Sequence, residues 1–184
     1  QVKLVLQMDD DEVVDGRLEN YNQNISQNIK NLSEEELRSY HPKAWNLKRK
    51  NFFLGKFLTK GGQYPDPVIR LYINGYAKLP QKDVHEQMIV NGDIEFAEGH
   101  LLHYSNPTFN DYLRKFNAYT SFKAEQLAKE KVPLNAVSFV EYFLFLPLKT
   151  FLSLFIRHKG FQDGIAGLVF AIMSGIYWQI SYLK

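Results

Sequence analysis

The sequence has 184 residues, enough for one ordinary domain with its own core but too few for two full domains. Apolar residues make up 45% of it and aromatic residues 15%, a composition that excludes a disordered chain. The net charge of +2, with basic residues scattered along the chain, argues against nucleic acid as the main partner, and the absence of cysteine excludes disulfides and thiolate chemistry.

The first predicted element is a short buried strand that is followed by a cluster of acids. Residues 2–8 form an apolar run of strand length, and Asp9, Asp10, Asp11 and Glu12 come directly after it. Ligands of open α/β sheets bind outside the carboxyl ends of strands, so this cluster is a candidate site. In one interpretation, one acid caps the next helix and the others are solvated. In the other, Asp9 and Asp11 point to one side and bind Mg²⁺ or Mn²⁺, while Glu12 braces the loop or caps the next helix.

Helices and strands then alternate through the body of the chain. Sparse apolar residues at helical spacing predict an exposed amphipathic helix from residue 17 to about residue 37, and Ser33 with Glu36 forms the pattern of a capping box. The segments 43–55 and 66–75 have the composition of strands and are separated by a Gly-Pro loop. The body is therefore predicted to be mixed α and β.

Two further signals follow in the second half of the body. Asn91-Gly92 stands between two apolar-rich runs, the strongest short-range pattern for a β-hairpin. Aromatic residues and leucine at helical spacing within residues 109–131 then predict a helix that has Thr108 as its cap.

The last fifty residues are far more apolar than the rest. Residues 164–183 carry no charge and are long enough, at about 1.5 Å per residue, to cross about 30 Å of hydrocarbon. Gly167, Ala171 and Gly175 form a stripe of small residues, at which another helix can approach closely. The preceding segment is the expected partner of this stripe.

That preceding segment, 139–156, is a poor spanning helix because Glu141, Pro147 and Lys149 interrupt it. Its charges fall on one side and leave a broad aromatic and leucine face, as in helices that lie in the membrane interface. We therefore expect an interfacial helical hairpin, with the basic residues 157–159 at anionic headgroups. A spanning helix and a helical pair packed on the body as ordinary core are the alternatives.

Four motifs make the sequence resemble family 2 glycosyltransferases. "LQMDDDEVV" resembles the D-x-D-E segment of that family, and "RKNFFLGKFLTKGGQYPDPVIRLY", "VHEQMIVNG" and "LLHYS" follow in the matching order. The resemblance is closest to the bacterial branch that contains lipopolysaccharide-core glucosyltransferases, and it extends from the first strand into the apolar tail. It implies an α/β fold of the GT-A type that uses a nucleotide-diphosphate sugar.

The resemblance also implies a metal site and a catalytic base. Asp9 and Asp11 would hold the divalent ion that bridges the diphosphate, with Asp10 as the variable position between them at the substrate. His103 falls where many GT-A enzymes place a further metal ligand. Glu86 falls where inverting enzymes carry the general base that deprotonates the acceptor hydroxyl. Without the resemblance, Glu86 would be an acid at a hairpin edge and His103 a partly buried strand residue.

Further residues would contact the substrates. Gly61-Gly62 corresponds to a glycine-rich loop near the sugar and the acceptor, although by itself it has the pattern of a turn. Asp66 and Arg70 would line the acceptor or brace this loop, and His85 would orient the base or simply pack. The basic run 48–50 would meet phosphates by the resemblance, although a solvated strand edge is its default interpretation.

These features predict the C-terminal portion of a metal-dependent, inverting glycosyltransferase. Residues 1–132 would be the C-terminal part of the catalytic domain, and residues 133–184 would be a membrane-associated apolar helical hairpin. The N-terminal nucleotide-binding half of the family is missing from this sequence. We therefore expect the chain alone to bind a nucleotide sugar poorly and to be inactive.

The expected donor is the nucleotide diphosphate of a hexose such as glucose, and the expected acceptor is a saccharide or a lipid-linked sugar of the cell envelope. Transfer would take place at the cytoplasmic face of the bacterial inner membrane. A non-catalytic membrane-surface protein and a transferase that uses a polyprenyl-phosphate sugar are the alternative interpretations.

Overall fold

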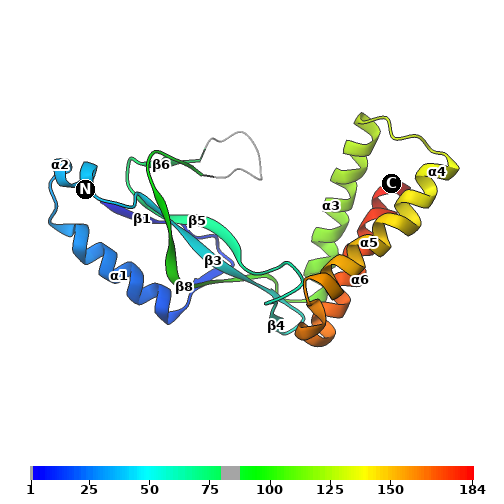
Figure 1. Ribbon diagram of the computed structural model, residues 1–184, viewed down its shortest axis with the longest axis horizontal. Helices are drawn as coiled ribbons and strands as arrows, with labels where there is room; N and C mark the ends of the chain where they lie inside the picture. The colour runs from blue at the N-terminus through cyan, green and yellow to red at the C-terminus, as the bar shows by residue number, and fades with distance from the viewer. Residues whose placement is uncertain (1, 80–87) are drawn as a thin grey trace. The chain divides into compact units, whose positions relative to one another are not determined.

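The structure is a computed structural model that describes residues 2–79 and 88–184 (Figure 1). It contains helices and strands, which confirms the predicted mixed α and β class. The chain forms two compact units: unit 1 is Gln1–Lys50 with Pro65–His103, and unit 2 is Asn51–Tyr64 with Tyr104–Lys184. The division into a catalytic part, 1–132, and a hairpin, 133–184, concerns function and stays a prediction.

Unit 1 is built on a sheet in which the strand order is β1-β5-β3-β8-β2. The strands are β1 (Leu4–Leu6), β2 (Glu12–Val14), β3 (Ala44–Phe53), β5 (Asp66–Ile73) and β8 (Ile94–Asn106), and the last residues of β3 and β8 belong to unit 2. The pairs β1–β5, β3–β5 and β2–β8 are antiparallel. Although β1 and β2 are neighbours in sequence, they occupy opposite ends of the strand order, so the residues between them pass from one edge to the other.

The core of unit 1 lies between this sheet and two helices, α1 (Gly16–Lys30) and α2 (Glu34–Ser39). Leu18 and Ile29 of α1 pack with buried strand residues that include Trp45. The predicted capping box is confirmed: the Glu36 amide donates to Oγ of Ser33, and the Ser33 amide donates to the Glu36 carboxylate at 2.6 Å. The capping box begins the second helix, so the predicted helical region consists of two helices.

The hairpin predicted at Asn91-Gly92 is wrong. The residues before it, β7 (Ile89–Val90), pair with β6 (Ala77–Lys78), and the residues after it enter β8. Since β8 lies between β3 and β2, β7 pairs elsewhere. Gly92 has a φ of 138°, and a Cβ there would lie 2.3 Å from Cγ of Lys43. Glycine at this position therefore permits a close approach to Lys43 and does not make a hairpin turn.

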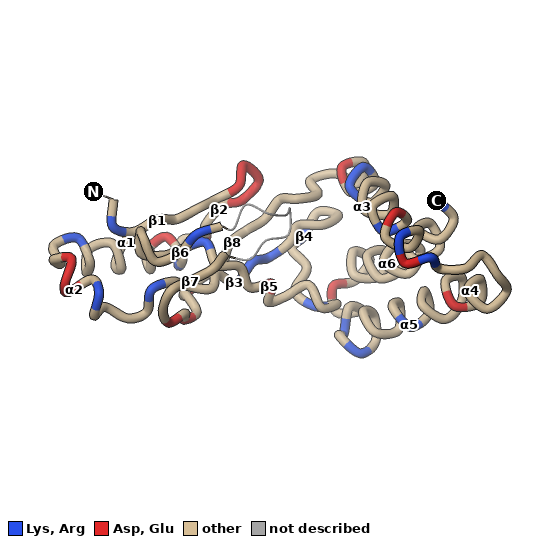
Figure 2. The backbone as a smooth tube through the Cα atoms, turned by 90° about the horizontal axis from the view of Figure 1, so that it is seen from above, with Lys and Arg blue, Asp and Glu red and all other residues tan. Residues whose placement is uncertain are grey.

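Unit 2 consists of helices together with β4 (Lys56–Phe57), which pairs with the end of β3. Its first helix is α3 (Phe109–Lys129). The Asp111 amide donates to the side chain of Thr108, which confirms the predicted cap. The charged residues of α3 contrast with the sparse charges of the helices that follow (Figure 2).

The apolar tail forms a helical hairpin, as predicted. Limb 1 runs through α4 (Ala136–Val140), the π-helical η1 (Glu141–Phe145), α5 (Leu146–Leu152) and the π-helical η2 (Ser153–Arg157). Limb 2 consists of the 3-10 turn η3 (Gly160–Asp163) and α6 (Gly164–Leu183). In limb 1, the Leu146 amide donates to the Glu141 carbonyl, five residues back. This wider turn stands directly before Pro147, which has no amide hydrogen, and lets the helix continue past it.

The stripe of small residues in α6 is where limb 2 meets limb 1, as predicted. Gly167, Ala171 and Gly175 are all buried. A Cβ on Gly175 would lie 3.0 Å from the carbonyl oxygen of Pro147 in limb 1, whereas a Cβ on Gly167 would lie 2.0 Å from that of Gly160 in η3, within limb 2. The backbones are therefore too close for larger side chains.

Candidate functional site

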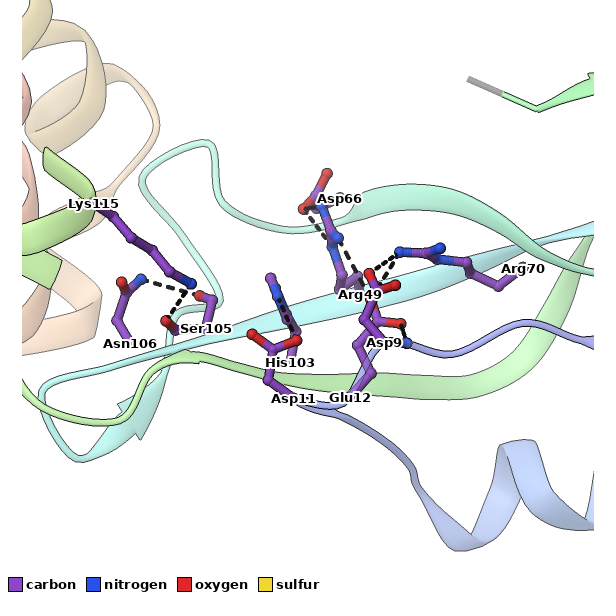
Figure 3. A network of polar contacts seen from close by, with 10 residues as sticks. All are labelled: Asp9, Asp11, Glu12, Arg49, Asp66, Arg70, His103, Ser105, Asn106 and Lys115. Atoms are coloured by element: carbon purple, nitrogen blue, oxygen red, sulfur yellow. Dashed lines mark hydrogen bonds and ion pairs between the residues drawn. The ribbon is translucent and has the colours of Figure 1, made fainter. Parts of the chain in front are cut away.

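The acidic cluster lies in the segment that crosses the sheet of unit 1. Residues 7–11 connect β1 at one edge with β2 at the other, and β5, β3 and β8 lie between these edges. The Gln7 amide donates to the Arg70 carbonyl of β5 at 2.8 Å, and Glu12 is the register partner of His103 on β8. This crossing brings consecutive acids next to side chains of three different strands (Figure 3).

Asp9 forms an ion pair with Arg70. Nη2 of Arg70 also lies 3.5 Å from Oε1 of Glu12. The Arg70 side chain is only 16% exposed, whereas that of Asp9 is 52% exposed. The arginine is thus a fixed, largely buried cation of the sheet, and the aspartate reaches it from the loop.

Glu12 is the buried acid of the cluster, with a fully inaccessible side chain. Its Oε2 accepts a hydrogen bond from the Asp9 amide at 3.1 Å, so the predicted bracing of the loop is confirmed. Its Oε1 has no hydrogen-bond partner among the described residues, and it lies 3.6 Å from Arg49 and 3.5 Å from Arg70. A buried carboxylate is costly unless cations offset its lost hydration, and these two arginines do so.

Arg49 belongs to the site, although the default prediction for the run 48–50 was a solvated strand edge. It is the register partner of Asp66 on β5, and its Nη2 and Nε lie 2.8 and 2.9 Å from Oδ2 of that aspartate. Its side chain is 21% exposed. The prediction of a solvated edge is therefore wrong for Arg49, because its cross-strand neighbour is an acid and the buried Glu12 lies 3.6 Å from it.

Asp11 and His103 form the pair that best fits a metal ion. Oδ1 of Asp11 lies 3.4 Å from Nε2 of His103, because β2 and β8 are adjacent and Asp11 directly precedes β2. A carboxylate and an imidazole are both ligands of divalent ions such as Mn²⁺. Of the three predicted metal ligands, these two are together, while Asp9 is held by Arg70. Within residues 2–79 and 88–184, no group of three His, Asp or Glu side chains is arranged to hold a metal.

The remaining predicted residues lie elsewhere. Asp10 is exposed in the turn before β2. Gly61 and Gly62 belong to unit 2, where both have a positive φ and the Gly61 amide donates to the His158 carbonyl at 2.9 Å. Glu86 and His85 lie outside the described residues.

A second histidine–carboxylate pair anchors α1 to the sheet. Oδ2 of Asp15 lies 2.8 Å from Nδ1 of His100, and its Oδ1 accepts the Leu18 amide as the cap of α1. Burial acts to raise the pKa of Asp15, but the hydrogen bonds from Leu18 and His100 together outweigh it and lower the pKa. The sequence gives no sign of this pair, because only the sheet register brings residue 100 beside the helix start.

Comparison with curated proteins adds a relative. The lipopolysaccharide core biosynthesis glycosyltransferase LpsC of Rhizobium meliloti (strain 1021) is 28% identical over 137 residues, which are 73% of this chain and 49% of that protein. The chain is thus similar to a glycosyltransferase. It spans about half the length of this relative. No family model and no solved structure matches the chain.

Proposed function

We propose that the chain is part of an inverting, GT-A type glycosyltransferase of family 2, which moves a hexose such as glucose from a nucleotide diphosphate to a cell-envelope acceptor. The similarity to a lipopolysaccharide core glycosyltransferase, over 73% of the chain, carries this proposal. Two features of unit 1 support it: Asp11 next to His103, and two arginines next to the acids. In transfer from a sugar diphosphate, a metal ion and cationic side chains both offset the negative charge on the leaving diphosphate.

Asp11 and His103 are the residues that would hold Mg²⁺ or Mn²⁺, and Asp9 would join them on leaving Arg70. Their oxygen and nitrogen donors suit an ion that keeps positions open for phosphate oxygens. Such an ion would stabilise the charge that develops on the departing diphosphate. Arg70, separated from Asp9, would offer its guanidinium to the same phosphates, for which its planar fork of donors is suited.

Glu86 is the proposed general base, and His85 is proposed to orient it. The carboxylate takes the proton of the acceptor hydroxyl while the hydroxyl oxygen bonds to the anomeric carbon and the bond to the diphosphate oxygen breaks. In this proposal Asp10 and Asp66 contact the substrates beside Arg70, and Gly61-Gly62 allows close approach of the sugar and the acceptor.

The proposed acceptor is a saccharide or a lipid-linked sugar, and the proposed location is the cytoplasmic face of the bacterial inner membrane. Two helices, Ala136–Arg157 and Gly160–Leu183, are long and apolar enough to cross a membrane by length and composition, a test that the core helix of a soluble protein also passes. Such helices support an association with membranes.

Sugar transfer by the intact protein tests the proposal. The protein is incubated with a panel of nucleotide-diphosphate sugars and core-oligosaccharide acceptors, and products are analysed by mass spectrometry and NMR. We expect inversion at the anomeric carbon and a requirement for Mg²⁺ or Mn²⁺. Asp11→Asn and Glu86→Gln should each lower kcat about 100-fold or more. Glu98→Gln, at an exposed acid of β8, is the matched control and should keep the wild-type rate.

Three outcomes would contradict the proposal. Wild-type rates in both site variants would remove the assigned site. Transfer from polyprenyl-phosphate sugars but not from nucleotide sugars would favour the alternative of a polyprenyl-phosphate-dependent sugar transferase. Membrane binding without any nucleotide-sugar binding would favour a non-catalytic membrane-surface protein.

A further inference from the structure

A buried acid anchors the β4 loop to the turn of the helical hairpin. Asp163, the last residue of η3 at the start of limb 2, is only 3% exposed. It accepts hydrogen bonds from the Thr59 amide and hydroxyl, both at 3.0 Å, and from the Lys60 amide at 2.8 Å. Lys56 donates to the Asp163 carbonyl at 3.1 Å. Residues about one hundred positions apart in sequence are therefore held together within unit 2.

This anchor gathers basic side chains at one end of the hairpin. Lys56 and Lys60 of the β4 loop join Arg157, His158 and Lys159 of the turn, and all five residues are exposed. We name these five residues the basic turn. Oδ1 of the buried Asp163 also lies 3.9 Å from Nζ of Lys56, so this acid offsets part of the charge of that lysine, and the other four residues of the basic turn remain exposed.

Limb 1 presents an apolar face along its whole length. Six residues of this face recur every three or four positions, and Phe145 lies next to one of them. All seven side chains are 46% to 76% exposed: Val137, Val140, Leu144, Phe145, Leu148, Leu152 and Ile156. At about 1.5 Å per residue, it extends about 29 Å and ends at the basic turn. The other side of limb 1 is covered by α6, where the Trp178 indole donates to Thr150 and Tyr142 stacks on Tyr182.

The packing of α3 against α6 decides how this face meets a bilayer. At one end, the rings of Tyr112 in α3 and Phe170 in α6 both pack on Phe53; at the other, Lys184 donates to Thr120 at 2.9 Å. The helices therefore run side by side. α3 carries six charged residues: Asp111, Arg114, Lys115, Lys123, Glu125 and Lys129. If the hairpin spanned the bilayer, these charges would be drawn into hydrocarbon, which is strongly unfavourable.

We propose that the apolar face of limb 1 and the basic turn form one docking surface for a bilayer that contains anionic phospholipids. Limb 1 lies in the plane of the interface, with its apolar side chains among the acyl chains and the basic turn on the phosphates of the headgroups. α3 stays on the water side. This inference deepens the membrane location within the proposed function, and it does not depend on sugar transfer.

Vesicle binding without any sugar tests the charge of this surface. The intact protein is sedimented with vesicles of phosphatidylcholine, alone or mixed with phosphatidylglycerol. We expect the partition coefficient to be at least about tenfold higher with phosphatidylglycerol and to fall with added salt. Arg157→Gln with Lys159→Gln should abolish this preference. Arg17→Gln with Lys78→Gln removes the same charge from unit 1 and should leave binding unchanged. Equal binding of both double variants would overturn the role of the basic turn.

Depth measurements test the in-plane orientation. Because the chain has no cysteine, a spin label can be placed at single introduced cysteines, Val140→Cys, Leu148→Cys, Ile156→Cys and Arg114→Cys. We expect the three labels of limb 1 to lie at one shallow depth and the α3 label to remain in water. A Leu148 label at the bilayer centre, with the other two near the surfaces, would instead establish a spanning helix and overturn the proposal. Neither the vesicle binding nor the label depths require sugar transfer, so a protein without transferase activity would give the same two results.

Discussion

Arg70 holds Asp9, an aspartate that the family resemblance assigns to a metal ion. The same guanidinium lies 3.5 Å from the buried Glu12. Arg70 and a bound cation would both draw on the one carboxylate of Asp9 and would repel each other, so we expect the two partners to compete for it. A donor that brings both a metal ion and phosphates would satisfy Asp9 and Arg70 separately.

Replacing this arginine should strengthen metal binding. In Arg70→Gln, Asp9 loses its ion pair and becomes available beside Asp11. Without a sugar donor present, Mn²⁺ should therefore bind about fivefold more tightly, because this change in affinity corresponds to the free energy of a partly exposed ion pair. Electron paramagnetic resonance of free Mn²⁺ during titration measures this affinity. The matched control is Arg114→Gln, an exposed arginine of α3, which should not change it. Weaker binding in Arg70→Gln than in the control would contradict the competition.

Removing the buried carboxylate should destabilise unit 1. Glu12→Gln leaves Arg49 and Arg70 without the charge that lies between them, and loss of one partner of a buried ion pair costs about 3 kcal/mol. Each unit contains one tryptophan, Trp45 in unit 1 and Trp178 in unit 2, so fluorine NMR of fluorotryptophan follows the two units separately during urea unfolding.

The control for this variant is Asp10→Asn, at an exposed acid of the same loop. It should change the free energy of unfolding by less than about 0.5 kcal/mol. If both variants unfold at the same urea concentration, Glu12 does not brace the site.

The acid stability of unit 1 should depend on Asp15. The pKa of this carboxyl is lowered in the folded chain, so its stabilising effect is complete above its unfolded pKa of about 4 and is lost as the pH falls through the folded value. Asp15→Ala should cost about 1 kcal/mol at pH 7, because the cap of α1 is lost. Asp15→Asn keeps a capping oxygen and should retain most of the stability at pH 7, but with a flatter loss in acid. Urea unfolding at a series of pH values, read at Trp45, measures both effects.

Local patterns in the sequence were enough to predict the helix caps at Ser33 and Thr108 and the stripe of small residues in α6, because these features depend on neighbours along the chain. The partners of Arg49 and Asp15 could not be predicted in this way. They depend on which strands are adjacent, and a strong local signal such as Asn91-Gly92 was overridden by the strands already paired with β8. The crossing of residues 7–11 has the same origin, since no local pattern shows that consecutive strands lie at opposite edges.

The close packing of the hairpin predicts a graded response to added methyl groups. Gly167→Ala places a Cβ 2.0 Å from a backbone oxygen, so it should destabilise unit 2 by about 1–3 kcal/mol, as overpacked cores do. Gly175→Ala, with 3.0 Å of room, should have a smaller effect, because the gain in helix propensity, up to about 1 kcal/mol, offsets part of the crowding. Gly16→Ala at the start of α1 is the control, because a Cβ added there would meet no neighbouring group within 4 Å. It should leave unit 2 unchanged.

The Trp178 resonance reports this order directly, because its indole donates to Thr150 across the two limbs. In urea unfolding, the midpoint for this resonance should fall most in Gly167→Ala and less in Gly175→Ala, and it should keep its wild-type value in Gly16→Ala. The Trp45 resonance should keep its midpoint in the two α6 variants, since both substitutions lie in unit 2. A Gly167→Ala protein as stable as wild type at Trp178 would mean that α6 does not pack on η3 through backbone contact at Gly167.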